Sequence, residues 1–333
     1  MSTFIIAEMS ANHNHNKQIA LDTIKAAKEA GADAVKIQTY TADTITLNCE
    51  NKYFQINQGT LWDGTTLYKL YQQAYTPWEW HQDLFDYAKE LNIPIFSTPF
   101  DKTAVDFLED LNNPIMKIAS FELVDIPLIK YAASKGRPMI MSTGIATLEE
   151  IQDAVDACRK VGNNDITLLK CTSSYPAPLS EANLMTIPDM AKLFNCKVGL
   201  SDHTTGDIGA CTAVALGASV IEKHFIIDRS IGGPDSAFSM NKDEFSVMVK
   251  RIRDTESCLG TVSYELSDKM KNNRKFARSL FACKDIKKGE VFSEENVRSV
   301  RPGNGCNPKY LPELLGKKSN RNYKFGEPII YDL

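Results

Sequence analysis

The chain has 333 residues, of which 43% are hydrophobic and 24% charged, as in an ordinary globular protein of two domains or one large domain with an appendage. Its formal net charge of -4 and the lack of a long basic run do not indicate a nucleic-acid partner, and no apolar run approaches the roughly 20 residues of a membrane span. No basic region precedes the first apolar run, and the eight cysteines are scattered without a C-x-x-C pair, so we expect a cytoplasmic protein with reduced thiols and no zinc ribbon.

Apolar, partly β-branched runs recur along the first 225 residues, with helical periodicity between them. We expect these runs to form strands at residues 4–9, 34–39, 94–98, 115–120, 138–143, 166–172, 198–203 and 219–225. Continuous apolar character is typical of parallel strands buried on both faces. Eight such β/α units favour a TIM (β/α)8 barrel. A doubly wound sheet is the alternative, but no G-x-G-x-x-G motif follows the first strand.

Several helix boundaries are also predicted from the sequence. A helix over 17–30 is expected to end before Gly31, in the position after a helix that glycine favours. Thr76 is predicted to cap the next helix, over 77–91, with proline in its first turn. Thr147 begins a T-L-E-E capping box at the start of another helix.

The connection over 40–75 is too long for a simple strand-to-helix link. It is rich in Thr, Asn, Tyr and Trp, and it leaves the predicted carboxyl-end face of the barrel. Loops of this length in compact domains are often lids or binding loops, so the connection, with Trp62 and Tyr71, is a candidate cover for a site. The alternative is a surface insertion that packs on the barrel rim.

The character of the chain changes after about residue 260. A basic connector over 269–275 precedes short strand signals at 279–283, 287–292, 298–303 and 323–329. The similar pieces K-K-G-E-V-F and Y-K-F-G-E-P-I are hairpin signals and suggest a small pseudo-symmetric β domain. We therefore divide the chain into a barrel domain (1–260), a linker (261–276) and a β-rich domain (277–333).

Polar side chains stand at the carboxyl end of nearly every predicted strand, which is where TIM barrels carry their chemistry. His203 closes the seventh strand and His224 the eighth, beside Glu222. Two imidazoles on neighbouring strand ends, among carboxylates and hydroxyls, suit a divalent metal held against a small anionic substrate. Alternatively, the two histidines hydrogen-bond to neighbouring loops.

Three lysines, Lys36, Lys117 and Lys170, also stand near strand ends. Together with many hydroxyls they suit a ligand that carries a phosphate and a carboxylate. A lysine inside a barrel is costly unless it is paired. The alternative is that these lysines only neutralise Glu8 or Glu222.

Nine motifs now make a resemblance specific. They are A-E-M-S-A-N-H-N, V-K-I-Q-T-Y, F-S-T-P-F, K-I-A-S-F-E, S-T-G-I-A-T, C-T-S-S-Y-P, G-L-S-D-H, V-I-E-K-H-F and V-R-S-V-R-P-G-N-G, in this order over essentially the whole chain. The chain resembles the sialic acid synthase family, which condenses phosphoenolpyruvate with an N-acylated hexose. That resemblance implies a TIM barrel followed by an antifreeze-like (SAF) domain in a domain-swapped homodimer. Within the family, A-E-M-S-A-N-H, T-Y-T-A-D-T-I-T-L and Y-T-P-W-E-W-H resemble the pseudaminic acid synthase branch.

The resemblance also implies roles for individual residues. His203 and His224 would be the protein ligands of a divalent metal, Mn²⁺ or Mg²⁺, and Glu8 and Glu222 would take part in catalysis. The expected phosphoenolpyruvate ligands are Lys36, Thr98, Lys117, Ser120, Ser142, Ser173 and Ser201. Many relatives have asparagine in place of Ser173. The expected sugar ligands are Gln38, Tyr175, Asp235 and, from the other subunit, Arg301.

Three other functions remain open at this point. The chain could be a sialic or legionaminic acid synthase, with the same chemistry on a different hexosamine. It could be a metal-dependent aldolase or lyase, which would act on pyruvate. It could also be a non-catalytic sugar-binding protein, although a binding module has no need of a metal pair.

Overall fold

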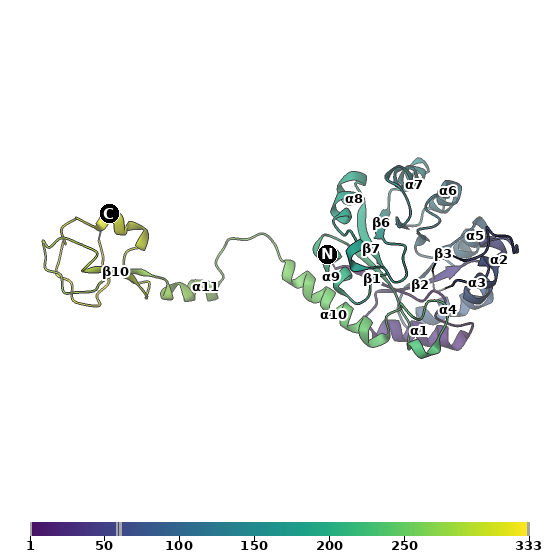
Figure 1. The fold of residues 1–333 in the computed structure, drawn as a ribbon, viewed down its shortest axis with the longest axis horizontal. Coiled ribbons are helices and arrows are strands. Elements are labelled where there is room, and N and C mark those ends of the chain that lie inside the picture. Colours follow the sequence, from purple (N-terminus) through teal and green to yellow (C-terminus); the bar gives the residue numbers. More distant parts are fainter. Residues whose placement is uncertain (1, 58, 60–61, 332–333) are drawn as a thin grey trace. The chain divides into compact units, whose positions relative to one another are not determined.

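The fold was analysed in a computed structural model that describes residues 2–57, 59 and 62–331. Its first unit, 1–260, is a closed barrel of parallel strands in sequential order, with helices arranged outside it (Figure 1). This confirms the predicted fold class. The strands are β1 (Phe4–Glu8), β2 (Ala34–Thr39), β3 (Ile95–Pro99), β4 (Met116–Ile118), β5 (Met139–Ser142), β6 (Ile166–Cys171), β7 (Lys197–Asp202) and β8 (Val220–His224).

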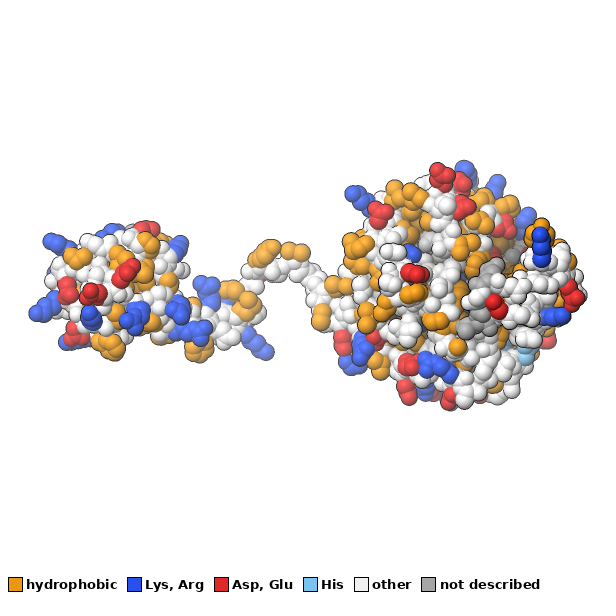
Figure 2. Space-filling view, in the orientation of Figure 1, with side chains coloured by type: hydrophobic (Ala, Val, Ile, Leu, Met, Phe, Trp, Pro, Cys, Tyr) orange, Lys and Arg blue, Asp and Glu red, His pale blue; other side chains and the backbone are white. Residues whose placement is uncertain are grey.

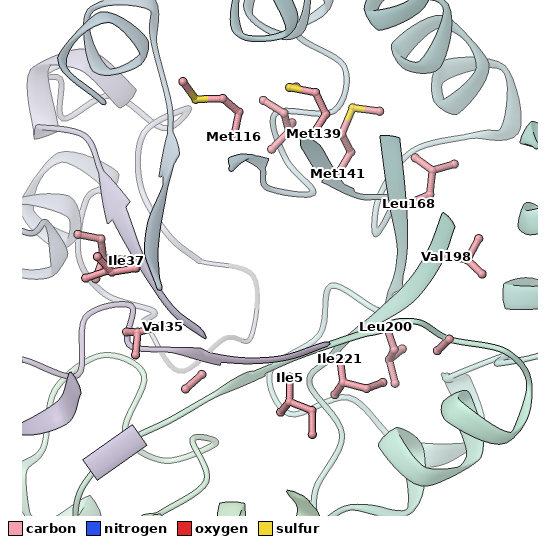
Figure 3. Packing of buried hydrophobic residues seen from close by; sticks show 14 of the residues in the cluster. Ile5, Val35, Ile37, Met116, Met139, Met141, Leu168, Val198, Leu200 and Ile221 are labelled. Atoms are coloured by element: carbon pink, nitrogen blue, oxygen red, sulfur yellow. The ribbon is translucent and has the colours of Figure 1, made fainter. Parts of the chain in front are cut away.

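The barrel strands bury both faces because successive side chains point to opposite sides of a strand. One set points outward and packs against the helices; it includes Ile5, Val35, Met139, Leu168 and Ile221 (Figure 3). The alternate set forms a separate apolar cluster: Ile6, Ala34, Phe96, Ile140, Leu169 and Val220. The position two residues further along each of those strands is Glu8, Lys36, Thr98, Ser142, Cys171 or Glu222. An apolar floor inside the barrel therefore supports a polar layer at the carboxyl ends.

A glycine makes room for this floor. Gly199 occupies the inward position of β7, and a Cβ there would lie 2.3 Å from the carbonyl oxygen of Val220 and 2.7 Å from a methyl group of Leu169. The floor therefore packs too closely for any side chain at this position. Two residues further along, Ser201 returns to the polar layer.

The helices around the barrel begin and end largely as their caps predict. These helices are α1 (Lys17–Glu29), α4 (His81–Glu90), α5 (Lys102–Asp110), α6 (Ile126–Ser134), α7 (Leu148–Lys160), α8 (Thr186–Phe194), α9 (Ile208–Ala215) and α10 (Lys242–Leu259). Gly31 follows α1 with φ 91°, and Thr147 forms the predicted capping box at α7. The Thr76 prediction is wrong. Residues 78–80 form a short 3-10 turn before α4, and the Thr76 hydroxyl instead contacts Nε2 of His13 at 3.2 Å.

The long connection between β2 and α4 has secondary structure of its own. It contains α2 (Ala42–Ile45) and α3 (Leu67–Ala74), the second capped by the side chain of Thr66. Residues 58, 60 and 61 of this connection lie outside the described residues. Trp62 donates from Nε1 to the carbonyl oxygen of Pro234 at 3.1 Å, so part of the connection reaches the loop that follows β8.

The second unit, 261–333, has its own small core around Leu280, Phe292 and Tyr323. Its elements are α11 (Asp268–Asn273), β9 (Ser279–Ala282), β10 (Val297–Val300) and α12 (Leu311–Leu314), and β9 and β10 pair antiparallel. Residues 332–333, the end of the predicted β-rich domain, lie outside the described residues, as does residue 1 of the barrel domain. On the face of each unit seen in Figure 2, acidic and basic side chains are interspersed.

The two similar pieces of this unit are turns rather than hairpins. In each, a backbone N–H bonds a glutamate three residues later: Lys287 to Glu290 at 2.8 Å and Lys324 to Glu327 at 2.9 Å. The flanking residues do not pair across their own turn. Ile286 pairs with Tyr323, so the two turns are joined to each other by a bridge. The pseudo-symmetry is therefore present, but the hairpin prediction is wrong because pairing is long-range.

Within the described residues, no helix is long and apolar enough to cross a membrane.

Candidate active site

Two buried lysines and two buried glutamates form the centre of the polar layer. Nζ of Lys36 lies 2.5 Å from Oε2 of Glu8 and 3.4 Å from Oε1 of Glu222. Nζ of Lys117 lies 3.4 Å from the same oxygen of Glu222. The pairing that the sequence left as an alternative is thus observed. This pairing leaves N–H donors of both lysines available, because an ammonium group has three of them and the 3.4 Å contact between Lys117 and Glu222 is close to the limit of a hydrogen bond.

Burial and charge give the carboxyl groups of Glu8 and Glu222 different pKa values. Burial raises the pKa of Glu8 to about 7; Lys36 opposes this effect and Glu222 adds to it. Burial also acts to raise the pKa of Glu222, but Lys117 and Lys36 outweigh it and hold that pKa below its ordinary value. Glu222 is therefore the ionised member near neutral pH, while Glu8 can gain or lose a proton.

Hydroxyl groups surround the lysines. Oγ1 of Thr98 lies 3.4 Å from Nζ of Lys36, and Oγ of Ser201 lies 3.4 Å from Glu222. Ser120 and Ser173 hydrogen-bond to each other at 2.8 Å. Oγ of Ser142 is buried and has no hydrogen-bond partner among the described residues. Buried hydroxyls are ordinarily paired, so an unpartnered one in the same inward layer as two ammonium groups is suited to an anionic ligand.

Gly144 leaves space for the serine pair. A Cβ at this position would lie 2.0 Å from Oγ of Ser173 and 2.9 Å from Cβ of Ser120. The β5–α7 loop can thus approach the ends of β4 and β6 only without a side chain here.

The two predicted metal ligands lie together above the polar layer. The ring centroids of His203 and His224 are 5.4 Å apart. Nδ1 of His203 bonds the carbonyl oxygen of Thr172 at 3.0 Å, which makes Nδ1 the protonated nitrogen and leaves Nε2 as the ligand atom. Nδ1 of His224 is buried without a partner among the described residues, and burial, with the charges of His203 and Lys36, keeps the pKa of His224 well below its ordinary value.

Two imidazoles at this separation fit a divalent metal. Burial acts to lower the pKa of His203, but Cys171 and the carbonyl oxygen of Thr172 outweigh it and raise that pKa, so a metal would have to displace a proton from this ring. No group of three or more His, Cys, Asp or Glu side chains in the described part of the chain is arranged to hold an ion. The two histidines would therefore be its only protein ligands and would leave coordination positions for a substrate.

The candidate sugar ligands cluster beside Glu8. Nε2 of Gln38 donates to Oε1 of Glu8 and to Oγ of Ser10, both at 3.1 Å. Ser10 in turn donates to Asp235, whose carboxylate also accepts from the backbone N–H of Ala11 at 3.2 Å. The Tyr175 ring packs on His203, with centroids 4.4 Å apart. Gln38, Tyr175 and Asp235 are thus brought to one mouth with both histidines.

Other predicted groups do not join this centre. By alternation Lys170 is on the opposite face of β6 from Cys171, and its Nζ bonds a backbone carbonyl at 2.7 Å. Lys170 is therefore not a third inward lysine. Lys223 points outward to Asp202 at 2.7 Å and closes a strand-end turn. Arg301 belongs to the second unit, where it is exposed and precedes a cis proline.

Sequence reasoning missed three residues of the mouth. Ser10 hydrogen-bonds to both Gln38 and Asp235. Its φ of 47° is a left-handed conformation that is uncommon outside glycine, and the local sequence does not predict it. Phe238 packs on His224 with centroids 5.0 Å apart, although it lies 14 positions further along the chain. Gly144 could have been found as the small residue in the S-T-G motif.

Comparison with known proteins identifies the family of the chain. The chain matches the NeuB family over residues 23–264 and the SAF domain over residues 277–332. It is 51% identical over 326 residues to a pseudaminic acid synthase of Campylobacter jejuni, which covers 98% of this chain and 95% of the relative. Identity to the N,N'-diacetyllegionaminic acid synthase of the same organism is 38% over 331 residues, or 98% of each chain. The crystal structure of the spore coat polysaccharide biosynthesis protein SpsE of Bacillus subtilis superposes with a TM-score of 0.67 at 36% identity, over 99% of this chain and 94% of that one.

Proposed function

Since the chain belongs to the NeuB family, we propose that it catalyses the pseudaminic acid synthase reaction. Phosphoenolpyruvate and water condense with 2,4-diacetamido-2,4,6-trideoxy-L-altrose to give pseudaminic acid and phosphate. The observation that carries the proposal is the pair of buried lysines and buried glutamates directly below two imidazoles 5.4 Å apart. The preference for this sugar rests on the higher identity to the pseudaminic than to the legionaminic acid synthase.

The donor site lies among the lysines and hydroxyls. Lys36 and Lys117 neutralise the phosphate and carboxylate of phosphoenolpyruvate, and hydroxyls of Thr98, Ser142 and Ser201 accompany them. Ser120 and Ser173 are close enough to donate to one oxygen together. Binding of a trianion at this place offsets the cost of burying two ammonium groups.

The acceptor reacts as its open-chain aldehyde. A divalent metal bound between His203 and His224 would polarise the aldehyde oxygen as a Lewis acid. The family is metal-dependent, and Mn²⁺ or Mg²⁺ is the proposed ion. Gln38, Tyr175 and Asp235 orient the sugar so that its carbonyl carbon faces the methylene carbon of phosphoenolpyruvate.

The carboxyl groups of Glu222 and Glu8 then stabilise charge and accept a proton, respectively. When the methylene carbon bonds to the aldehyde carbon, positive charge develops at C2 of the donor, and ionised Glu222 stabilises it. Water adds to C2 and gives its proton to Glu8, whose raised pKa of about 7 suits a general base. The C2–O bond to phosphate then breaks as the C2 hydroxyl becomes the ketone of the product, and phosphate leaves with the bridging oxygen and the proton of that hydroxyl. The alkoxide formed from the aldehyde takes the proton held by Glu8 and becomes a hydroxyl.

A second copy of the chain completes the sugar site in this proposal. Arg301, exposed in the second unit, would reach the acylamino group of the acceptor from the partner subunit in a domain-swapped homodimer. Its planar guanidinium suits the carbonyl of such a group.

An acceptor panel tests the proposal. The metal-loaded protein is given phosphoenolpyruvate with the altrose derivative, its legionaminate-series diastereomer or N-acetylmannosamine, and released phosphate is measured. With donor labelled by ¹⁸O at the bridging position, the label should appear in phosphate, because the C–O bond breaks. Turnover of N-acetylmannosamine alone would overturn the assigned sugar. Turnover of pyruvate would favour an aldolase, and sugar binding without phosphate release would favour a binding protein.

A further inference from the structure

Three aromatic side chains from three different connections form one surface beside the imidazoles. We call Trp62, Tyr175 and Phe238 the aromatic wall. The centroid of Trp62 lies 5.8 Å from that of Tyr175, and Phe238 lies 5.2 Å from Tyr175. Tyr175 packs on His203 at 4.4 Å and Phe238 on His224 at 5.0 Å. All three rings of the wall are only half-buried.

The wall is joined to the polar side of the acceptor site. Trp62 bonds the carbonyl oxygen of Pro234, the residue before Asp235, and Asp235 is fixed by Ser10 and Ala11. The mouth therefore has a carboxylate and amide side, with Asp235 and Gln38, and an aromatic side. An acceptor that fills it must offer hydroxyl or amide groups to one side and apolar groups to the other.

The aromatic side is not required by the reaction chemistry. Neither Trp62 nor Phe238 can transfer a proton or bind the donor. Any apolar side chain would be enough to exclude water from the imidazoles. Two large, partly exposed aromatic rings at a substrate mouth are instead typical of recognition of an apolar group.

We propose that Trp62 and Phe238 are specificity-determining residues that hold the methyl group at carbon 6 of a 6-deoxy acceptor, and that they disfavour the corresponding 6-hydroxy sugar. The inference rests on the proposed function, because it starts from an aldehyde at the imidazoles. An open-chain hexose advances about 1.2 Å per single bond, as an extended polypeptide does, so carbon 6 lies about 6 Å from the aldehyde carbon. That reach is comparable to the distances from the imidazoles to the nearest rings of the wall, which are 4.4 Å from His203 to Tyr175 and 5.0 Å from His224 to Phe238, and Trp62 continues the wall beyond Tyr175.

The expected size of the effect is limited. A hydroxyl placed against aromatic carbon loses hydrogen bonds to water and gains none, but a hydrophobic pocket rejects an added hydroxyl by only about 10–100-fold. The wild-type protein should therefore prefer the 6-deoxy acceptor over its 6-hydroxy counterpart by a factor in this range in kcat/KM.

The test compares that preference in Trp62→Ala, Phe238→Ala and wild type. Tyr53→Ala is the matched control, because Tyr53 lies in the same connection as Trp62 but is 76% exposed. Each wall variant should reduce the 6-deoxy preference about 5- to 10-fold through the KM for the acceptor, with the KM for phosphoenolpyruvate unchanged. Trp62→Phe should restore much of the preference, which a merely destabilised protein would not do.

The outcomes separate this inference from the proposed function. The two acceptors that are compared always share the hexosamine that the wild type turns over. They differ only in whether carbon 6 carries a hydroxyl. If that core is N-acetylmannosamine, the proposed sugar is wrong, and the wall is still tested with 6-deoxy-N-acetylmannosamine. If the wall variants slow both members of the pair equally, or change neither, the wall does not select at carbon 6 and the inference is overturned. If the protein turns over none of the sugars, calorimetric binding of the two altrose derivatives decides in the same way.

Discussion

Gly144→Ala is expected to damage the donor site by displacing the two serines, Ser120 and Ser173, for which Gly144 leaves space. The added Cβ would lie 2.0 Å from Oγ of Ser173, far inside contact distance, and 2.9 Å from Cβ of Ser120. The hydroxyl of Ser173 can rotate away, but Cβ of Ser120 moves only with its backbone. The 2.8 Å bond between the two hydroxyls must therefore break, and at least one hydroxyl leaves the position assigned to phosphoenolpyruvate.

The magnitude follows from these contacts. A hydrogen bond from a hydroxyl to a charged group is worth about 1.5–3 kcal/mol, so kcat/KM for phosphoenolpyruvate should fall about 10–150-fold when one is lost. Overpacking should also cost about 1–3 kcal/mol of unfolding free energy. The assay is phosphate release at varied phosphoenolpyruvate and saturating acceptor, with thermal unfolding followed in parallel.

Two further variants make the result decisive. Gly162→Ala is the matched control, because Gly162 has φ 85° and no neighbour within 4 Å of a Cβ, so alanine should lower stability by about 1–2 kcal/mol through backbone strain alone. Its KM for phosphoenolpyruvate should not change. In Gly144→Ala/Ser173→Ala the 2.0 Å clash is removed but the 2.9 Å approach to Cβ of Ser120 remains, so stability should recover only in part while donor use stays low. A wild-type KM for phosphoenolpyruvate in Gly144→Ala would refute the donor site drawn here.

Three other predictions concern the metal site, the second unit and a buried histidine. His224→Ala should abolish metal-dependent turnover and leave thermal unfolding of the metal-free protein nearly unchanged; full activity would show that the metal lies elsewhere. Arg301→Ala should raise the acceptor KM by about 10-fold or more, as loss of a charged hydrogen bond does, and leave the KM for phosphoenolpyruvate alone, so an unchanged acceptor KM would exclude Arg301 from the sugar site. Burial and the charge of His15 lower the pKa of His13 from 6.5 to about 4. The unfolded chain therefore binds this proton below about pH 6.5 while the folded chain does not, and stability falls as pH drops through this window. Between pH 7 and pH 5 the wild type should lose about 2 kcal/mol more than His13→Gln in urea unfolding followed by tryptophan fluorescence, and equal losses would contradict the shift.

The order and type of the barrel elements could be predicted because each depends on local pattern. Apolar runs, caps and glycine ends are readable over a few residues, and the strand bounds differ from expectation by at most two positions. Thr76 shows where this fails. Threonine before proline is a good cap in isolation, but the hydroxyl is taken by His13, which is 63 positions away in the chain. The hairpin prediction for the turns at Gly289 and Gly326 is wrong for the same reason, because the residues that flank each turn pair with residues outside it.

The direction in which a strand-end side chain points could not be predicted for every strand. A parallel barrel strand is apolar on both faces, so its pattern does not distinguish inside from outside. Lys36 and Lys117 point inward, whereas Lys170 and Lys223 are offset by one position and point outward, although all four look alike in sequence. Only the register of the closed barrel makes this distinction.

Because of that register, two adjacent residues on one strand can have different environments, one facing the helices and one facing the inside of the barrel. Lys223 and Glu222 are neighbours on β8, and both are buried and charged. Lys223 meets a single carboxylate, Asp202, and two backbone carbonyls, Thr204 and Gly206, so its charge is satisfied within the protein. Glu222 lies between two ammonium groups that have donors to spare and leaves its own Oε2 without a hydrogen bond in the described residues. A fully satisfied buried ion pair gains nothing from a ligand, whereas an incompletely satisfied one is stabilised by it. The inward layer is therefore the part of this barrel that we propose for the anionic donor, because the phosphate and carboxylate can accept from the spare N–H groups of Lys36 and Lys117.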